Sequence, residues 1–186
     1  MKLAAVSDTD LSADPRSTIK IRAPRREDGA GVWQLISDTT SLDDNSMYCN
    51  LLQCSHFAST CALAEMDGEI VGWVSGYIPP EHPDTYFVWQ VCVAEKARGK
   101  GMAKRLINAV LARKVCANVT QVQSTITKDN KPSWALFGSI AETLDADLAR
   151  QPHFKRDDHF AGLHDTEFLV TIGPFERAAL PVRSAA

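Results

Sequence analysis

The chain has 186 residues, of which 45% are hydrophobic and 23% are charged, and its formal net charge at pH 7 is −3. These values are ordinary for a single globular domain. The 20 basic residues are spread along the chain beside 23 acidic ones, which argues against a nucleic-acid partner. The apolar runs are far short of a membrane span, and residues 1–16 lack the apolar segment of a signal peptide. We therefore expect a cytoplasmic protein without a membrane partner.

The first third of the chain predicts a tail, a strand and a helix. Residues 1–17 are small and polar without periodicity, and we expect a flexible N-terminal tail. Alternating apolar residues predict a short strand over residues 18–23. Apolar residues at helical spacing then predict a helix that ends near Thr39.

A polar loop over residues 41–50 leads into a second, short helix. Asn45 or Ser46 is suited to be its N-cap, because both side chains can accept a hydrogen bond from a backbone N–H of the first turn. Two further residues of this stretch have plain interpretations. Asp43 fits a loop or capping residue, and Tyr48 fits half-buried packing.

The middle of the chain predicts antiparallel strands. Residues 60–66 and 69–77 flank the turn Asp67-Gly68 and form the clearest hairpin in the sequence. A proline-rich loop over residues 79–83 can belong to neither a helix nor a strand. Residues 86–94 follow as a strand that is apolar on both faces, as expected of a central strand covered on both sides.

This strand leads through a loop with two glycines directly into a helix. Gly99 and Gly101 permit positive φ and allow bare backbone N–H groups to approach a ligand closely. The helix, predicted from Met102 to about residue 117, adds unpaired N–H donors and a partial positive charge at its N-terminus. A phosphate or pyrophosphate is the usual ligand of such a site. The plain alternative is an ordinary strand–helix turn that happens to contain two glycines.

The last third predicts a strand over residues 119–127 and then a helix that begins near Pro132. We expect an irregular, charged loop over residues 145–163 and a last strand over residues 167–172. Residues 174–186 are expected to form a loose tail.

The five cysteines are odd in number, and none stands in a Cys-x-x-Cys pair. They predict neither a disulfide framework nor a zinc site, and we expect no metal. Cys92 is interpreted as a small core residue.

Three phosphate-binding patterns can be compared with the glycine loop. The P-loop requires Gly-Lys followed by Ser or Thr, which is absent here. The dinucleotide pattern Gly-x-Gly-x-x-Gly has Lys104 where its third glycine belongs. The third pattern, Arg/Gln-x-x-Gly-x-Gly/Ala, is matched at every position by the hexapeptide Arg98-Gly99-Lys100-Gly101-Met102-Ala103.

This hexapeptide resembles the acetyl-CoA pyrophosphate loop of the GNAT family of N-acetyltransferases. The expected order of elements resembles that family over residues 18–173, which we take as one domain. The resemblance implies an α/β (α+β) fold with a central mixed, mostly antiparallel sheet flanked by helices, and acetyl-CoA as cosubstrate. The residues that it places at acetyl-CoA are Val91, Val93, Arg98, Gly99, Lys100, Gly101, Met102, Ala103, Asn130 and Ser133.

Two of these assignments depend on where the family pattern meets this sequence. Asn130 and Ser133 match the family's Asn-x-x-Ala/Ser at the next strand–helix junction, although Asn130 alone also fits a turn residue or helix cap. Many relatives carry, seven positions after this Asn, a Tyr that protonates the departing thiolate. Here that position is Phe137, which has no proton to give. The acid must therefore be Tyr48 or solvent.

A narrower resemblance links the chain to the L-2,4-diaminobutyrate acetyltransferases, which make the acetylated precursor of ectoine, a compatible solute. Five pieces in the right order carry it: Leu42-Asp43-x-Asn45-Ser46-x-Tyr48, Val88-Trp89-Gln90-Val91, Arg98-Gly99-Lys100-Gly101, Thr125-Ile126-Thr127-x-x-Asn130-x-x-Ser133 and His164-x-x-Glu167. The resemblance implies transfer of acetyl to the 4-amino group of L-2,4-diaminobutanoate, by an enzyme that relatives lead us to expect as a homodimer. It places Asp43, Tyr48, Trp89, His164 and Glu167 at the substrate, with Tyr48, His164 and Glu167 as catalytic candidates.

These side chains suit a ligand with two ammonium groups and one carboxylate. Asp43 and Glu167 can bind ammonium, Trp89 can offer a cation–π face, and His164 can donate to a carboxylate or accept a proton. Each also has a plain interpretation: Trp89 as core, His164 as exposed loop and Glu167 as a solvated charge at a strand edge. In a regular strand His164 and Glu167 would face opposite sides, so they share a ligand only if a turn or bulge intervenes.

The chemistry requires a neutral amine, because an alkyl ammonium with a pKa of about 10.4 cannot attack a thioester. A carboxylate or imidazole, acting directly or through water, can take that proton. We expect direct transfer in a ternary complex, with acetylation of Cys92 as a minor alternative. Two other functions stay open: a GNAT enzyme for another small amine or a protein N-terminus, and an acetyl-CoA-binding module without activity.

Overall fold

The structure is a computed structural model that describes residues 19–39 and 45–180. Its strands are β1 (Lys20–Arg22), β2 (Ala62–Met66), β3 (Glu69–Tyr77), β4 (Thr85–Val93), β5 (Gln121–Thr127), β6 (Leu148–Phe154) and β7 (Glu167–Ile172). Its α-helices are α1 (Gly29–Ser37), α2 (Met47–Ser55), α3 (Met102–Leu111), α4 (Lys131–Leu144) and the short α5 (Arg156–His159).

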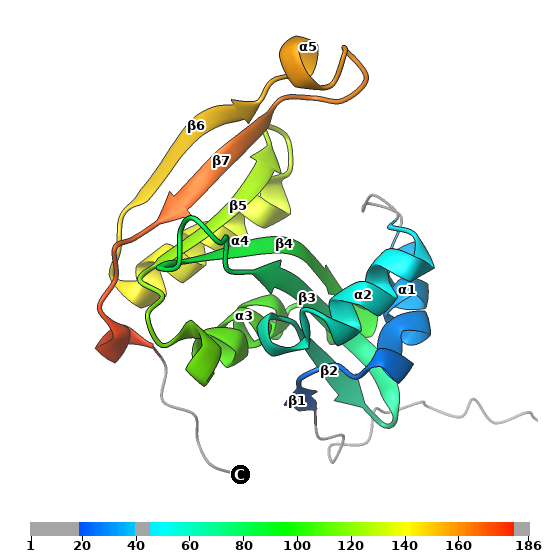
Figure 1. The fold of residues 1–186 in the computed structure, drawn as a ribbon. Coiled ribbons are helices and arrows are strands. Elements are labelled where there is room, and N and C mark those ends of the chain that lie inside the picture. The colour runs from blue at the N-terminus through cyan, green and yellow to red at the C-terminus, as the bar shows by residue number, and fades with distance from the viewer. Residues whose placement is uncertain (1–18, 40–44, 181–186) are drawn as a thin grey trace, which may run out of the picture.

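The strands form one seven-stranded sheet in the order β1-β2-β3-β4-β5-β7-β6 (Figure 1). All neighbouring pairs are antiparallel except β4 and β5, which are parallel. This confirms the expected mixed, mostly antiparallel sheet. The β2–β3 hairpin turns where predicted, with φ of +53° at Asp67 and +82° at Gly68. Positive φ at both central residues is what a two-residue turn between twisted strands needs.

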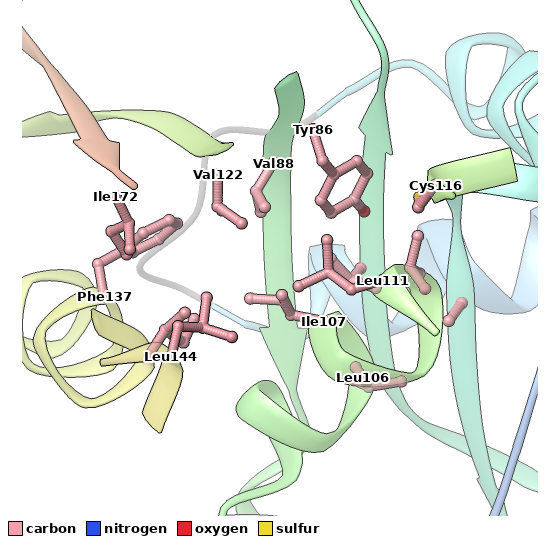
Figure 2. Close-up of a cluster of buried hydrophobic side chains, with 14 of the residues drawn as sticks. Tyr86, Val88, Leu106, Ile107, Leu111, Cys116, Val122, Phe137, Leu144 and Ile172 are labelled. Carbon is pink, nitrogen blue, oxygen red and sulfur yellow. The ribbon is translucent and has the colours of Figure 1, made fainter. Parts of the chain in front are cut away.

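Helices cover both faces of the sheet. On one face, α3 and α4 pack their apolar stripes on side chains of the central strands, as Figure 2 shows for Leu106, Ile107 and Leu111 of α3 and Phe137 and Leu144 of α4. On the other face, α1 and α2 enclose a second cluster, which includes buried residues of the sheet: Leu63, Trp73 and Cys92. Strand side chains alternate between faces, and β4 contributes Val88 to the first cluster and Cys92 to the second.

Three expectations need correction. The region 145–163 is not an irregular loop, because it contains β6 and α5; β6 is an edge strand with largely exposed residues, so it lacks an apolar pattern. Helix α3 ends at Leu111, well before residue 117, since Arg113 is already extended at φ −80° and ψ 156°. In this segment Arg113 donates to the carbonyl of Cys61 at 2.6 Å.

The expectation of a loose tail from residue 174 does not hold for residues 174–180. Phe175 is buried in the main core, and the Arg177 guanidinium donates to the carbonyls of Leu111 and Cys116. The predicted N-terminal tail, residues 1–17, lies outside the described residues, as does Asp43. Among the described residues, none of the helices has the length and apolar character needed to span a membrane.

Candidate active site

The strands β4 and β5 run together only at their beginnings. Their pairing joins Thr85–Phe87 to Gln121–Gln123, and the two strands then separate (Figure 1). Where they begin to part, the Ser124 hydroxyl donates to the carbonyl of Val88 at 2.9 Å. The remainder of β4 therefore presents an open backbone edge toward β5.

The backbone groups at this open edge belong to Val91 and Val93. The Ala94 N–H donates to the carbonyl of Val71 on β3 at 2.9 Å. Since hydrogen-bonded and non-hydrogen-bonded pairs alternate along an antiparallel ladder, Val93 and Val91 occupy the non-hydrogen-bonded positions. Their N–H and C=O groups thus point away from β3, toward the gap. One of these groups, the Val93 carbonyl, accepts from Arg98 Nε at 3.0 Å.

The glycine loop follows this strand and has the backbone that its sequence predicts. Gly99 has φ +75° and Gly101 has φ +65°, and Gly101 is the N-cap of α3 without a capping side chain. A Cβ added at either glycine would meet no protein atom within 4 Å. Because no side chain caps α3, its first N–H groups remain available to an anion. Met102 is 2% exposed, so only its backbone is available to a ligand.

A cleft of about 630 Å³ joins the strand edge, the loop and the start of α4. Six of the residues expected at acetyl-CoA line it, namely Val91, Val93, Arg98, Ala103, Asn130 and Ser133. The remaining four, Gly99 to Met102, form the loop at its end. The other residues that line the cleft were not predicted at acetyl-CoA: Thr39, Cys92, Thr127, Asp129, Pro132 and Leu136.

Asn130 and Phe137 have structural roles that restrict their possible functions in the cleft. Asn130 is the N-cap of α4, and its Oδ1 accepts from the Ser133 N–H at 3.1 Å. Capping therefore uses the carbonyl of this amide and leaves the Nδ2 group as the side that suits a cosubstrate. Phe137 is 2% exposed and packs in the main core, so this position cannot deliver a proton.

Trp89 stands at a β-bulge in β4. Ser75 of β3 pairs with Gln90 and Gly76 pairs with Val88, so Trp89 is an extra residue in the ladder. The indole is 48% exposed and meets the Tyr77 ring edge-to-face at 6.4 Å. Trp89 is therefore not a core residue and offers an aromatic surface beside the splayed strand.

Tyr48 lies in the first turn of α2, where Ser46 acts as N-cap by accepting from the Cys49 N–H at 3.2 Å. The ring of Tyr48 is 69% exposed. The interpretation as half-buried packing therefore does not hold, and its hydroxyl is accessible to a ligand.

His164 and Glu167 approach each other at the start of β7. His164 lies in the preceding loop, so strand alternation does not separate the two, and His164 Nε2 is 4.0 Å from Glu167 Oε1. His164 Nδ1 lies 2.8 Å from the carbonyl oxygen of Asp165. Because a carbonyl only accepts, Nδ1 carries the proton, and neutral His164 keeps its lone pair on Nε2. The Phe160 ring stands against the imidazole with centroids 4.7 Å apart.

Cys92 is a small core residue, as predicted. It is 2% exposed in the cluster beneath α1, and burial raises the pKa of its thiol. Its sulfur lies 3.2 Å from the Thr39 hydroxyl. Cys92 also lines the cleft, but a thiol with a raised pKa is a poor nucleophile, which disfavours an acetyl-cysteine route. Among the described residues, no group of three or more His, Cys, Asp or Glu side chains could hold a metal.

Comparison with known proteins identifies the family. A model of the acetyltransferase (GNAT) family matches residues 30–140. The L-2,4-diaminobutyric acid acetyltransferase of Methylotuvimicrobium alcaliphilum is 51% identical over 158 residues, which are 85% of this chain and 92% of the relative. The enzyme of the same name from Halomonas elongata is 47% identical over 161 residues, covering 86% of this chain and 83% of the relative.

Solved structures agree with these relatives. The diaminobutyrate acetyltransferase EctA of Paenibacillus lautus, in complex with its substrate L-2,4-diaminobutyric acid and coenzyme A, superposes with a TM-score of 0.82. It is 37% identical, and the match covers 87% of this chain and 98% of that chain. Ard1 of Thermoplasma volcanium shares the fold at 17% identity, with a TM-score of 0.64 over 83% of this chain and 97% of its own. The chain belongs to the GNAT acetyltransferase family and, within it, to the L-2,4-diaminobutyric acid acetyltransferases.

Proposed function

We propose that this enzyme transfers the acetyl group of acetyl-CoA to the 4-amino group of L-2,4-diaminobutanoate, giving N4-acetyl-L-2,4-diaminobutanoate for ectoine synthesis. The observation that carries the proposal is the open edge of β4 beside the glycine loop. Backbone groups that point away from β3 and a helix N-terminus meet there, the exposed Trp89 stands on the same strand, and the relatives of the chain bear this enzyme's name. Each group suits one part of the two ligands.

The cleft along β4 suits acetyl-CoA. Residues 98–103 direct backbone N–H groups toward the pyrophosphate, which the positive end of α3 also attracts. Val91 and Val93 offer the amide groups of a strand edge to the pantetheine chain. When pantetheine binds, the Val93 carbonyl either accepts from both Arg98 Nε and pantetheine or loses its hydrogen bond to Arg98. Asn130 and Ser133 close the cleft from the start of α4.

The charged residues suit diaminobutanoate, whose α-ammonium stands beside its carboxylate. We assign Glu167 and His164 to this end of the molecule, since the Glu167 carboxylate can bind the ammonium and a protonated His164 can donate from Nε2 to the substrate carboxylate. Trp89 lies nearer the reacting amine, where its face can hold a cation before deprotonation. Asp43 is assigned to the reacting-amine end, together with Trp89, by resemblance alone. Gripping one end of the substrate presents the other for acetylation.

Acetyl transfer requires two proton movements, one at the amine and one at the leaving thiolate. The reacting ammonium must lose one, which a carboxylate or an imidazole can take directly or through water. The departing thiolate must gain one, for which the exposed Tyr48 hydroxyl is the side-chain candidate and solvent the alternative. Holding amine and thioester in line contributes the larger entropic part of the acceleration.

We also propose that the enzyme works as a cytoplasmic homodimer, as the family resemblance implies. Exposed apolar residues on the β6–β7 arm support self-association: Phe154 is 42% exposed and Leu163 is 91% exposed. Light scattering of the purified protein at several concentrations would give a mass of two chains. A mass of one chain at all concentrations would refute the dimer.

The test of the function is a panel of amines assayed by release of free CoA thiol. Diaminobutanoate should give the highest kcat/KM, with ornithine, lysine, simple alkyl amines and a peptide N-terminus well below it. A preference for the peptide or another amine would replace the substrate and leave the acetyltransferase. CoA binding by calorimetry without thiol release from any amine would leave only a binding module.

A further inference from the structure

The bulge at Trp89 has a second effect on β4. Tyr77 pairs with Phe87, and Ser75 pairs with Gln90, so side chains on both sides of the bulge fall on the face of β3 that carries Tyr77 and Ser75. Trp89 contacts Tyr77 on that face. Two consecutive residues, Trp89 and Gln90, therefore project to the same side, which a regular strand does not allow.

In this orientation, the Gln90 side chain forms a hydrogen bond with Asn45, just before the start of α2. Its Oε1 accepts from Asn45 Nδ2 at 3.1 Å, in a partly buried contact between residues 45 positions apart. Asn45 directly precedes Ser46, whose hydroxyl caps α2 through the Cys49 N–H. The position of Asn45 is thus transmitted to the first turn of α2, where Tyr48 stands.

The end of α1 is tied to the same face of β4. The Thr39 hydroxyl donates to the Leu35 carbonyl at 2.9 Å, and its oxygen lies 3.2 Å from the sulfur of Cys92. Cys92 and Gln90 are two residues apart in the strand, so they share a face. The end of α1 and the start of α2 are consequently attached at neighbouring points of β4.

We propose that Asn45 and Gln90 are positioning residues for acetyl transfer, whose hydrogen bond fixes Tyr48 relative to Trp89. Each partner is close in sequence to one of the two: Gln90 adjoins Trp89, and Asn45 precedes Tyr48 by three residues. Neither side chain needs to touch a ligand for this role. The inference rests on the proposed function in so far as Tyr48 and Trp89 are the substrate residues.

The need for such a bond follows from exposure. The Tyr48 ring is 69% exposed, so packing does little to hold its hydroxyl in place. A displacement of about 1 Å at a reacting group can cost about a hundredfold in rate. A bond that fixes the start of α2 therefore acts on turnover of the amine. Acetyl-CoA bound along the edge of β4 that faces β5 should be little affected.

The test is a double-mutant cycle with Asn45→Ala and Gln90→Met, measured as kcat/KM for whichever amine the parent acetylates. Each single variant should lose about tenfold to a hundredfold, and the double variant should lose no more than the worse single one. The KM for acetyl-CoA should change less than about threefold. In a Tyr48→Ala background, Gln90→Met should cost almost nothing further.

Gln123→Met is the matched control, because it also breaks a partly buried glutamine bond between elements, from Gln123 Nε2 to Thr171 Oγ1 at 3.2 Å. It should lower Tm as much as Gln90→Met and leave the kinetics unchanged. Losses that multiply in the double variant, or an undiminished effect of Gln90→Met without Tyr48, would overturn the positioning role. If the amine preferred by the parent is not diaminobutanoate but the cycle still shows coupling, the proposed function fails and this inference stands.

Discussion

The glycine at the start of α3 can be tested by the substitution Gly101→Ala, because folding and cosubstrate binding respond to it differently. Gly101 has φ +65°, and an added Cβ would meet no protein atom within 4 Å. The cost to folding is therefore the strain of a left-handed alanine, about 1–2 kcal/mol. A domain of this size should lose roughly 2–8 °C in Tm from such a change.

The cost to acetyl-CoA binding is larger. Relaxation of the strained backbone would turn an N–H away from the pyrophosphate, and retention of φ would place a methyl group in the space it needs. Loss of one hydrogen bond to a charged group costs about 1.5–3 kcal/mol. That free energy corresponds to a rise of about 10- to 150-fold in the KM or Kd for acetyl-CoA. The KM for the amine should be nearly unchanged.

Gly68→Ala is the matched control. Gly68 has φ +82°, and a Cβ there would also meet nothing within 4 Å, but it lies in the β2–β3 turn. Both variants should melt at similarly reduced temperatures, and only Gly101→Ala should bind CoA weakly in calorimetry and steady-state kinetics. An unchanged acetyl-CoA KM in folded Gly101→Ala, or an equal rise in Gly68→Ala, would refute the role of the loop.

Three further outcomes are expected. Tyr48→Phe removes only the exposed hydroxyl and should lower kcat by about a hundredfold or more if Tyr48 is the acid; an unchanged kcat in stopped-flow assays would transfer that role to solvent. Phe137→Tyr should leave kcat unchanged and cost about 1–3 kcal/mol in urea unfolding, because it buries a hydroxyl; a faster enzyme would contradict this. The Arg22 guanidinium holds the pKa of Asp28 below its usual value, so Asp28 stabilises the fold above about pH 3.9 and loses this effect as the pH falls through the lowered pKa. Asp28→Asn should therefore cost about 1.5–3 kcal/mol at pH 7 and progressively less as the pH falls through the lowered pKa, and a cost in urea titrations that does not change with pH would exclude the ionic contribution.

The parts of the fold that the sequence predicts well are those where local chemistry decides. Asp67-Gly68 requires a turn wherever it occurs between strand-forming segments, and the structure has it there. Ser46 was one of two expected N-caps, and its hydroxyl performs that role. The glycine loop was identified because Gly99 and Gly101 leave little choice of backbone. Local rules of this kind do not depend on the rest of the chain.

The parts that were missed depend on distant partners. β6 has almost no apolar pattern, since it is an exposed edge strand that exists only by pairing with β7. Phe175 and Arg177 look like tail residues until α3 and the following turn provide a surface and two carbonyls for them. Arg113 ends α3 early by bonding to a segment more than fifty residues away.

The candidate site shows the same division. The residues expected at the substrate follow from family motifs, and the structure brings His164 to 4.0 Å from Glu167 because His164 lies in the loop before β7, where strand alternation does not apply. Exposure of Trp89 could not be predicted, because a single extra residue in the ladder reverses which side chains face outward. The link between Asn45 and Gln90 follows from the same bulge, and no sequence pattern reveals it.

The position of the new acetyl group tests the account most directly. Purified enzyme would be incubated with acetyl-CoA and L-2,4-diaminobutanoate, and the product examined by two-dimensional NMR. If Glu167 and His164 grip the α-amino-acid end, the amide proton should correlate with the γ-methylene, showing acetylation of the 4-amino group alone. A correlation with the α-carbon proton as the main signal would contradict the assigned orientation, and turnover of simple alkyl monoamines at the same rate would show that the α-amino-acid end is not bound at all.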